Sequence, residues 1–271
     1  MKLQKNQQKR TRLIPVLVLQ LSLIGVLSCR GGPSGAQEAP PGRDEGTSKQ
    51  RIAEADELYR QRDDLAKVRL GVALLRQARI SDYGSYEAAW KSAKFNYYLA
   101  AHTEDERERE AAFREGIDTG KIALQLQGDK PEGHFWLGAN YGGSAEHSTL
   151  AGLANVEDIR REMEAVIKID EGYQDGSAYL GLGQLYLQAP RIMGGDYLKA
   201  IQYLEKGLKF GATNAFLRLE LAEAYHAANR DGDAKKQIAF IQSMTPNPDY
   251  LPEYKEAVER AKKLEEKIDR K

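Results

Sequence analysis

The chain has 271 residues, one cysteine, and equal numbers of basic and acidic side chains, 40 of each. Because no basic excess is available to neutralise phosphates, this composition argues against a nucleic-acid-binding protein. A single cysteine excludes a disulfide framework or a cysteine-based zinc framework, and the length allows one large domain or two small ones.

The amino terminus has the parts of a secretory signal. Residues 1–12 carry five basic side chains and no acid, and Leu13–Leu27 is almost wholly apolar. The apolar run is too short to cross a bilayer, which takes about 20 residues. It ends in the run VLSC, which resembles a bacterial lipobox, where the signal is cut before the cysteine and a lipid is attached to its sulfur. We therefore expect residues 1–28 to be a lipoprotein signal peptide and Cys29 to be lipidated. An ordinary signal peptide or an uncleaved anchor is the alternative.

The segment after the cysteine is rich in Gly, Pro, Ser and charged residues. Such a sequence buries too little to offset its ordering entropy, so residues 29–48 are predicted to be a disordered tether for a folded domain of residues 49–271. Arg30 stands where lipoproteins retained in the inner membrane commonly carry aspartate, so the outer membrane is preferred. The expected location is the bacterial cell envelope, facing the periplasm.

From Gln50 onward, apolar residues recur at spacings of three and four, as in amphipathic helices, and no stretch alternates like a strand. Four similar patterns each end in a tyrosine, namely Tyr97, Tyr141, Tyr186 and Tyr225. These are 44, 45 and 39 residues apart (141 − 97, 186 − 141, 225 − 186), a period in the range of helical repeats.

Within these patterns a large residue is followed by Leu, a small residue and Tyr, which resembles the first helix of a tetratricopeptide repeat (TPR). The small residue lets two helices approach closely, and Leu and Tyr fill the groove between them. Long loops are expected within most pairs, because the second apolar segments start late. The residues predicted to pack the repeats are Trp90, Tyr97, Leu137, Gly138, Tyr141, Leu182, Gly183, Tyr186, Leu221, Ala222, Tyr225 and Ala234.

The predicted fold is therefore all-α, a TPR-like α-solenoid of about four to five antiparallel helix pairs. An amino-terminal pair at about 49–60 and 64–80 opens the stack, and a helix over 253–269 caps its carboxyl end.

The sequence carries no catalytic motif that we can assign. His134 and His147 lie in one repeat, but their spacing matches no dense zinc motif, so His134 is predicted to pack between helices. Gly120-Lys121 lacks the spacing and the Ser or Thr of a phosphate-binding loop. The chain is predicted to be no enzyme and to need no cofactor or metal. A metal-dependent hydrolase is the enzymatic alternative.

Three aromatic residues are candidates for binding rather than packing. Tyr98, Phe135 and Trp136 each adjoin another aromatic residue or a packing leucine. Because consecutive side chains cannot all face one helix seam, these three either meet the neighbouring repeat or line a concave surface for a ligand or partner.

The turn after Tyr186 is five residues longer than its counterpart in the last repeat. It contains Gly194 and Gly195, which permit a backbone conformation closed to other residues, and Asp196, which can cap the next helix. These residues are predicted to form a hinge and a cap, and the enlarged loop is a candidate partner contact.

Three stretches, Tyr86–Tyr98, His134–Tyr141 and Pro190–Leu204, together resemble the T component of TRAP-type solute transport systems (TatT), which are periplasmic lipoproteins of degenerate TPR-like pairs. The resemblance implies a periplasmic solute-binding subunit as partner and homo-oligomers around a cavity for a small ligand. It carries over no single binding residue. A general scaffold for cell-envelope assembly is the alternative. In both cases we expect an envelope protein partner, membrane attachment through the N-terminal lipid, and no nucleic acid.

Overall fold

The computed structural model describes residues 44–147 and 149–270, which belong to one compact unit of residues 41–271. Cys29 and the predicted signal peptide lie outside the described residues. All regular elements of the described ranges are helical: α1 Glu45–Tyr59, α2 Leu65–Ser81, α3 Tyr86–His102, α4 Glu106–Gln127, α5 Pro131–His147, α6 Thr149–Ile169, α7 Tyr173–Gln188, α8 Tyr197–Gly207, α9 Ala215–Ala227, α10 Asp231–Ser243 and α11 Leu251–Asp269, with 3₁₀ turns η1 Arg191–Met193 and η2 Pro248–Tyr250.

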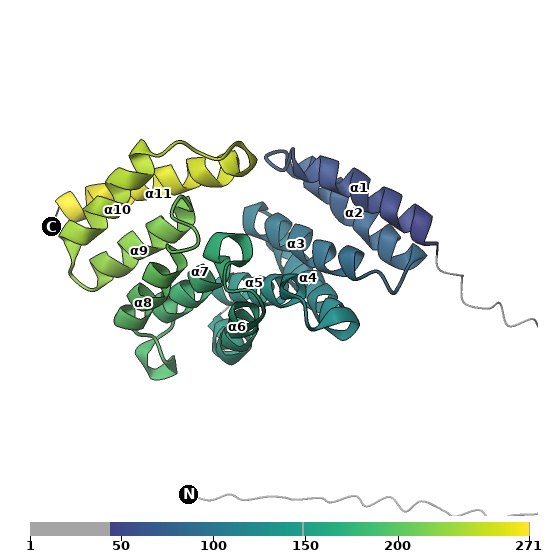
Figure 1. Cartoon of the computed structure of the whole chain (residues 1–271), viewed down its shortest axis with the longest axis horizontal. Helices are drawn as coiled ribbons and strands as arrows, with labels where there is room; N and C mark the ends of the chain where they lie inside the picture. The colour runs from purple at the N-terminus through teal and green to yellow at the C-terminus, as the bar shows by residue number, and fades with distance from the viewer. Residues whose placement is uncertain (1–43, 148, 271) are drawn as a thin grey trace, which may run out of the picture. The chain divides into compact units, whose positions relative to one another are not determined.

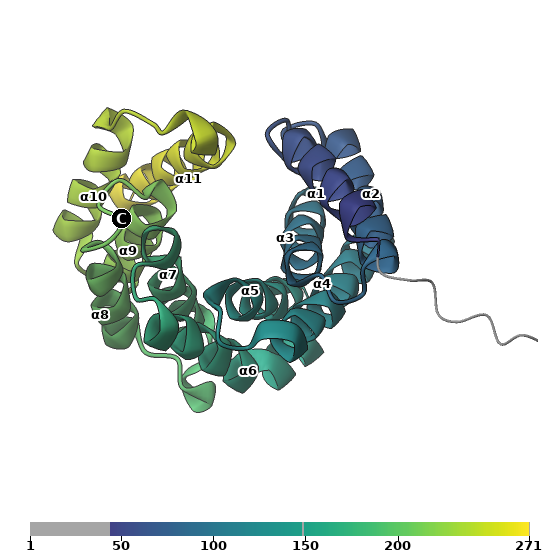
Figure 2. The same cartoon turned by 45° about the vertical axis from the view of Figure 1, so that its right-hand side comes forward.

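The helices form five consecutive pairs, α1–α2 to α9–α10, and α11 packs on α9 and α10 at the carboxyl end. The pairs follow one another along a curved row, from α1 in purple to α11 in yellow (Figures 1 and 2). The predicted all-α, TPR-like solenoid with a C-terminal capping helix is confirmed.

Side-chain caps set where several helices begin. The Asp44 carboxylate accepts a hydrogen bond from the backbone N–H of Thr47 at 2.9 Å, and α1 starts at Glu45, inside the segment predicted to be a tether. Ser48, at the predicted end of the tether, is buried. An aspartate that accepts from the first free N–H groups of a helix stabilises that start, and this is the physical reason for the earlier boundary.

The loops within the α3–α4 and α5–α6 pairs are shorter than the sequence predicted. Asp105 caps α4 through the N–H groups of Arg107 and Glu108, so only three residues separate α3 from α4. A single residue stands between α5 and α6. The extra length of these repeats is therefore helix rather than loop, because α4 already begins at Glu106 and α6 at Thr149.

Glycines set the register between neighbouring pairs. A Cβ on Gly71 of α2 would lie 2.4 Å from the Phe95 ring of α3, and a Cβ on Gly116 of α4 would lie 2.0 Å from Oδ1 of Asn140 on α5. Each contact needs glycine, because a side chain from the next pair fills the space. The two glycines are 45 residues apart (116 − 71), and so are their two partners (140 − 95). The contact of α2 with α3 and that of α4 with α5 are therefore related by a shift of 45 residues.

This register differs by one residue from the spacing of the tyrosines. Asn96, which is 3% exposed, corresponds to Tyr141 (141 − 96 = 45). The predicted alignment of Tyr97 with Tyr141 is therefore corrected: Tyr97 lies one position beyond the packing position. Lys94 likewise lies one position beyond Ala93, which is fully buried and takes the place of Gly138. One residue is about 100° of rotation around a helix, enough to change the face that a side chain occupies.

The long turn between α7 and α8 is built by its two glycines. Gly194 has φ 93°, in the left-handed region, and a Cβ on Gly195 would lie 1.8 Å from the carbonyl oxygen of Ala189. Asp196 then accepts hydrogen bonds from the backbone N–H groups of Leu198 and Lys199 at 2.9 and 3.2 Å, which starts α8. These residues build the turn itself.

Candidate functional site

Helices α3, α5 and α7 lie on the inner side of the curved row, and α4, α6 and α8 lie on its outer side (Figure 2). The inner side of this part of the row is therefore formed by the first helix of each pair. A surface of this kind, formed by several neighbouring helices, is where the candidate site lies.

A cluster of one lysine and three aromatic residues lies where the end of α1 meets α3 and α5. We call it the Lys94 cluster; it consists of Tyr59, Lys94, Tyr97 and Trp136, from the end of α1 and from α3 and α5. The Lys94 Nζ lies 4.0 Å from the centroid of the Tyr59 ring and 5.8 Å from that of Trp136. The rings of Tyr97 and Trp136 have centroids 5.8 Å apart. The lysine is thus held by cation–π contacts on two sides.

No carboxylate stands within ion-pair distance of Lys94 among the residues that the structure describes, although its amine is half-buried. Burial lowers the pKa of Lys94 to about 8, and the charge of Asp56 only partly opposes this. Lys91, one turn earlier, differs: its Nζ lies 2.6 Å from both Asp56 and Glu87. A desolvated ammonium without a counter-ion gains from any carboxylate that a ligand brings.

A buried arginine stands next to the cluster and joins the two ends of the described unit. The Arg62 guanidinium donates to both oxygens of Glu253 on α11, at 2.8 and 2.7 Å, and to the carbonyl oxygen of Asp249 at 2.5 Å. Its Cζ also lies 5.1 Å from the Tyr59 ring centroid. We call these contacts of Arg62 with Glu253 and Asp249 the Arg62 clasp.

Most of the residues predicted to pack the repeats lie between helices. In this set only Trp90 and Tyr97 are half-buried; Trp90 packs against Ala89 and Ala123. The buried members are Leu137, Gly138, Tyr141, Leu182, Gly183, Tyr186, Leu221, Ala222, Tyr225 and Ala234.

The three aromatic residues proposed for a binding surface are placed differently from one another. Tyr98 is 6% exposed and stacks on the His102 ring with centroids 3.9 Å apart. Trp136 is also buried, but its ring joins the Lys94 cluster, and the half-buried Phe135 contacts it edge to face. The structure thus brings Trp136 together with Tyr97 and Lys94.

The turn residues Gly194, Gly195 and Asp196 stand apart from this cluster in their contacts. Gly194 faces Arg160 of α6, and Gly195 packs on the backbone of residues 189–190. The turn is therefore not a wall of the Lys94 cluster. Sequence reasoning missed Lys94 and Arg62. The available signal for Lys94 was that the tyrosine alignment set a lysine against Gly138 and Gly183, a mismatch that the corrected register removes.

His134 is bound on both sides by protein groups. Its Nδ1 lies 2.6 Å from a carboxylate oxygen of Glu162, and its Nε2 lies 2.9 Å from the carbonyl oxygen of Gly128. The hydrogen bond to Glu162 raises the pKa of His134. Across the described ranges, no group of three metal-ligating side chains comes together.

Helix pairs stacked through close glycine contacts, with one helix of each pair on the inner side, define a TPR-type α-solenoid. A crystal structure of a thermophilic TPR protein from Thermus thermophilus is similar to it with a TM-score of 0.58 and 18% identity, covering 78% of this chain and 98% of that one. Two crystal structures that also match are MamA (TM-score 0.46, 17% identity, 81% and 94% covered) and a tetratricopeptide repeat protein from Parabacteroides merdae (0.38, 14%, 83% and 93%).

The chain belongs to the family described as regulator of microtubule dynamics protein 1–3, whose sequence profile matches residues 51–187, just over half of its length. No curated protein matches it. Within the described part of the chain, we find no helix with the length and apolar character needed to cross a bilayer.

Proposed function

We propose that the chain is a lipid-anchored, non-enzymatic protein-interaction module whose inner side binds a segment of another envelope protein. The Lys94 cluster carries this proposal, because it holds a half-buried ammonium without a counter-ion between the rings of Tyr59 and Trp136. Tyrosine and tryptophan side chains are the usual anchors of protein–protein interfaces. An acidic side chain of a partner would supply the missing charge.

Two narrower roles fit this proposal. The resemblance of the sequence to the T component of TRAP-type systems supports an accessory role beside a periplasmic solute-binding subunit. The same surface would serve a general envelope scaffold. The family description, which names regulation of microtubule dynamics, favours a cytoskeletal partner as a further candidate. Co-sedimentation with polymerised tubulin tests that candidate directly.

The membrane anchor is tested at Cys29. Replacing Cys29 with alanine is expected to abolish incorporation of radiolabelled fatty acid, because the proposed lipid is bound to its sulfur. Labelled chain on a denaturing gel, followed by membrane fractionation, measures this. Label that persists in C29A contradicts the anchor, and Ser28→Ala, which keeps the cysteine and a small residue before it, is the control.

The interaction is tested by photo-crosslinking in cells of the native host. A photoreactive residue at Tyr97 of the full chain is expected to give an adduct with a partner. Lys94→Gln should reduce the yield at least about fivefold, because it removes the charge that the partner neutralises. Lys236→Gln, an exposed lysine on α10, is the matched control and should leave the yield unchanged.

The identity of the adduct, by mass spectrometry, separates the narrower roles. A solute-binding protein supports the transport role, and proteins of cell-wall assembly support the scaffold. No adduct at Tyr97, or an adduct that Lys94→Gln leaves intact, contradicts binding at the inner side.

A further inference from the structure

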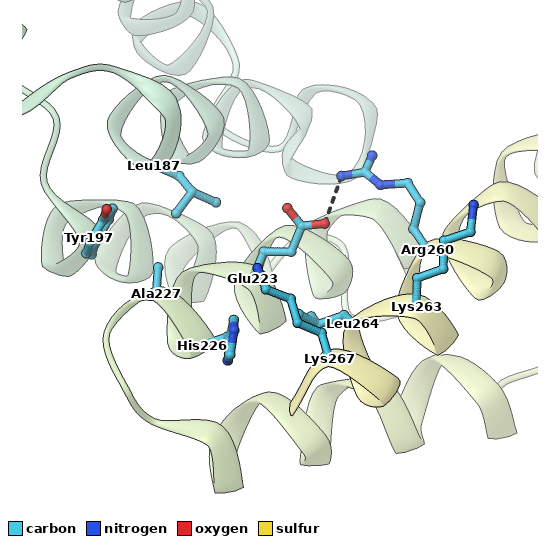
Figure 3. Close-up of a pocket in the computed structure, with 9 residues that line it drawn as sticks. All are labelled: Leu187, Tyr197, Glu223, His226, Ala227, Arg260, Lys263, Leu264 and Lys267. Carbon is cyan, nitrogen blue, oxygen red and sulfur yellow. Dashed lines mark hydrogen bonds and ion pairs between the residues drawn. The ribbon is translucent and has the colours of Figure 1, made fainter. Parts of the chain in front are cut away.

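A hollow lies between α7, α8, α9 and α11, far along the chain from the Lys94 cluster. It has a volume of about 580 Å³ (Figure 3). We call it the Arg260 pocket. Its lining comprises Leu187, Tyr197, Glu223, His226, Ala227, Arg260, Lys263, Leu264 and Lys267.

The guanidinium of Arg260 is fixed at the wall of this pocket by two carboxylates. Its Nη2 donates to Glu220 and to Glu223, both at 2.9 Å, and Figure 3 shows the contact with Glu223. Glu220 is fully buried and also accepts from Nε2 of Gln184 at 3.1 Å. Burial and the neighbouring Glu223 raise the pKa of Glu220, and Arg260 opposes this.

Arg260 retains donors that the protein does not use. A guanidinium has five N–H donors, and within the described ranges the hydrogen bonds of Arg260 come from Nη2 alone. The donors on Nε and Nη1 are therefore available to a ligand. Because both carboxylates hold the group in place, little side-chain entropy is lost when a ligand oxygen binds to it.

Two further cations face the same hollow from α11. Lys263 and Lys267 are three and seven residues after Arg260, on one side of the helix, and neither forms an ion pair among the described residues. The other basic group, His226, is already bound through Nδ1 to Asp231 at 2.6 Å. The free positive charge of the pocket thus comes from the two lysines, because the charge of Arg260 is already met by Glu220 and Glu223.

The opposite part of the pocket is apolar. Leu187, from the end of α7, and Ala227, from the end of α9, lie across from the side chains of α11, which include Leu264 (Figure 3). The hollow therefore offers basic groups beside an apolar floor. A ligand that fits carries a carboxylate next to an apolar side chain.

We propose that the Arg260 pocket binds an acidic segment of a protein partner, with carboxylates on Arg260, Lys263 and Lys267 and a neighbouring apolar side chain on Leu187 and Leu264. This deepens the proposed function and rests on it. A peptide suits the site better than an anionic membrane, because side chains from four helices line the hollow and its arginine is held by two carboxylates. A flat lipid surface meets protruding residues.

The test uses the full chain, purified in detergent, and a fluorescein-labelled peptide of alternating glutamate and leucine. Fluorescence anisotropy is expected to show binding that weakens with added salt. The double variant Lys263→Gln/Lys267→Gln should bind at least about tenfold more weakly, because two cations that face the carboxylates are lost. Lys262→Gln, on the same helix but outside the pocket lining, is the matched control and should bind like the unmodified chain.

Further arms identify the source of the carboxylate. A peptide with glutamine in place of glutamate should not bind, and amidation of the peptide's carboxyl end shows whether side chains or the chain end are recognised. Equal binding by the double variant overturns the proposal. So does binding of anionic vesicles through these lysines without binding of the peptide.

The outcomes also separate the two proposals. If the double variant loses the peptide while the Tyr97 crosslink proves absent, peptide binding at the Arg260 pocket is supported and binding at the Lys94 cluster is contradicted. If the crosslink forms and depends on Lys94 but the double variant keeps the peptide, only the pocket is overturned. Unchanged circular dichroism and thermal midpoint of the double variant exclude misfolding as the cause of a loss.

Discussion

Arg62→Ala is expected to separate the amino-terminal helix pair from η2 and α11. The clasp consists of a two-point ion pair with Glu253 and a hydrogen bond to the Asp249 carbonyl, and the Arg62 side chain is only 7% exposed. Removing one member of a buried ion pair leaves the other without its partner. Such a loss costs about 2 to 4 kcal/mol of the free energy that holds these elements together.

Small-angle X-ray scattering of residues 41–271, which form one compact unit, measures this opening as an increased radius of gyration. Hydrogen exchange should also accelerate in α1 and in the first turns of α11. Arg62→Lys is the graded control, because it keeps the charge but not the two-point geometry, and an intermediate effect is expected. An unchanged radius and unchanged exchange in the alanine variant would show that other contacts close the unit.

Lys94→Met is expected to stabilise the fold at neutral pH. The pKa of Lys94 is about 8 in the folded chain, below its ordinary value of 10.5, because burial disfavours the ammonium. Methionine fills a similar volume without this charge. The expected gain in the free energy of unfolding is roughly 1 to 3 kcal/mol, since one pKa unit corresponds to about 1.4 kcal/mol.

The gain should depend on pH with a defined sign. The unfolded chain binds this proton more tightly than the folded chain, so the charged lysine destabilises the fold fully below pH 8. The cost disappears as the pH rises from 8 to 10.5. Over that range the free energies of unfolding of the two proteins should converge, apart from a constant difference in packing. The charged groups that act on Lys94 are Asp56, Arg62, Lys91 and Glu253.

Urea denaturation at pH 7, 9 and 10.5 measures this difference, with Lys236→Met as an exposed control that should change little at each pH. A gain that stays constant with pH would assign it to packing alone. A destabilised variant at pH 7 would mean that the ammonium has a partner in solution. The same variant should lose the crosslinked partner, so stability and binding are expected to change in opposite directions.

The sequence was sufficient to predict the helices, the repeat and the capping helix. Helical periodicity depends on residues three and four apart, which a single sequence displays directly. Small residues such as Gly138 and Gly183, where an added Cβ would come within 2.7 and 2.4 Å of Met163 and Leu204, mark close helix contacts on their own. Spacing and small residues in the sequence therefore suffice to predict the helix pairs and how closely they pack.

The first repeat shows where such reasoning fails. In the α3–α4 pair, Asn96 stands at the position that Tyr141 holds in the next pair, and a tyrosine follows directly. A search for tyrosine therefore selects Tyr97. The correct register becomes visible only through partners in other helices, such as Phe95 against Gly71. The shift concerns the proposed site, because Lys94 and Tyr97 both belong to the Lys94 cluster.

The Arg62 clasp lay beyond sequence reasoning for a different reason. Its members are 191 residues apart, and neither has a local pattern that names the other. An arginine in a short loop and a glutamate near the start of a helix are ordinary in any sequence. Only the accumulated curvature of five helix pairs decides that they meet.

That separation also bears on how the chain folds. In a repeat array each unit contacts only its neighbours, so terminal units fray first and folding can start anywhere along the row. A contact between the first pair and the last helix couples the two terminal units, and neither can fray without breaking it. Because loop closure over such a distance is entropically costly, the clasp should form late, after the pairs between have stacked. We therefore expect the clasp to make unfolding of the row more cooperative than nearest-neighbour contacts alone would.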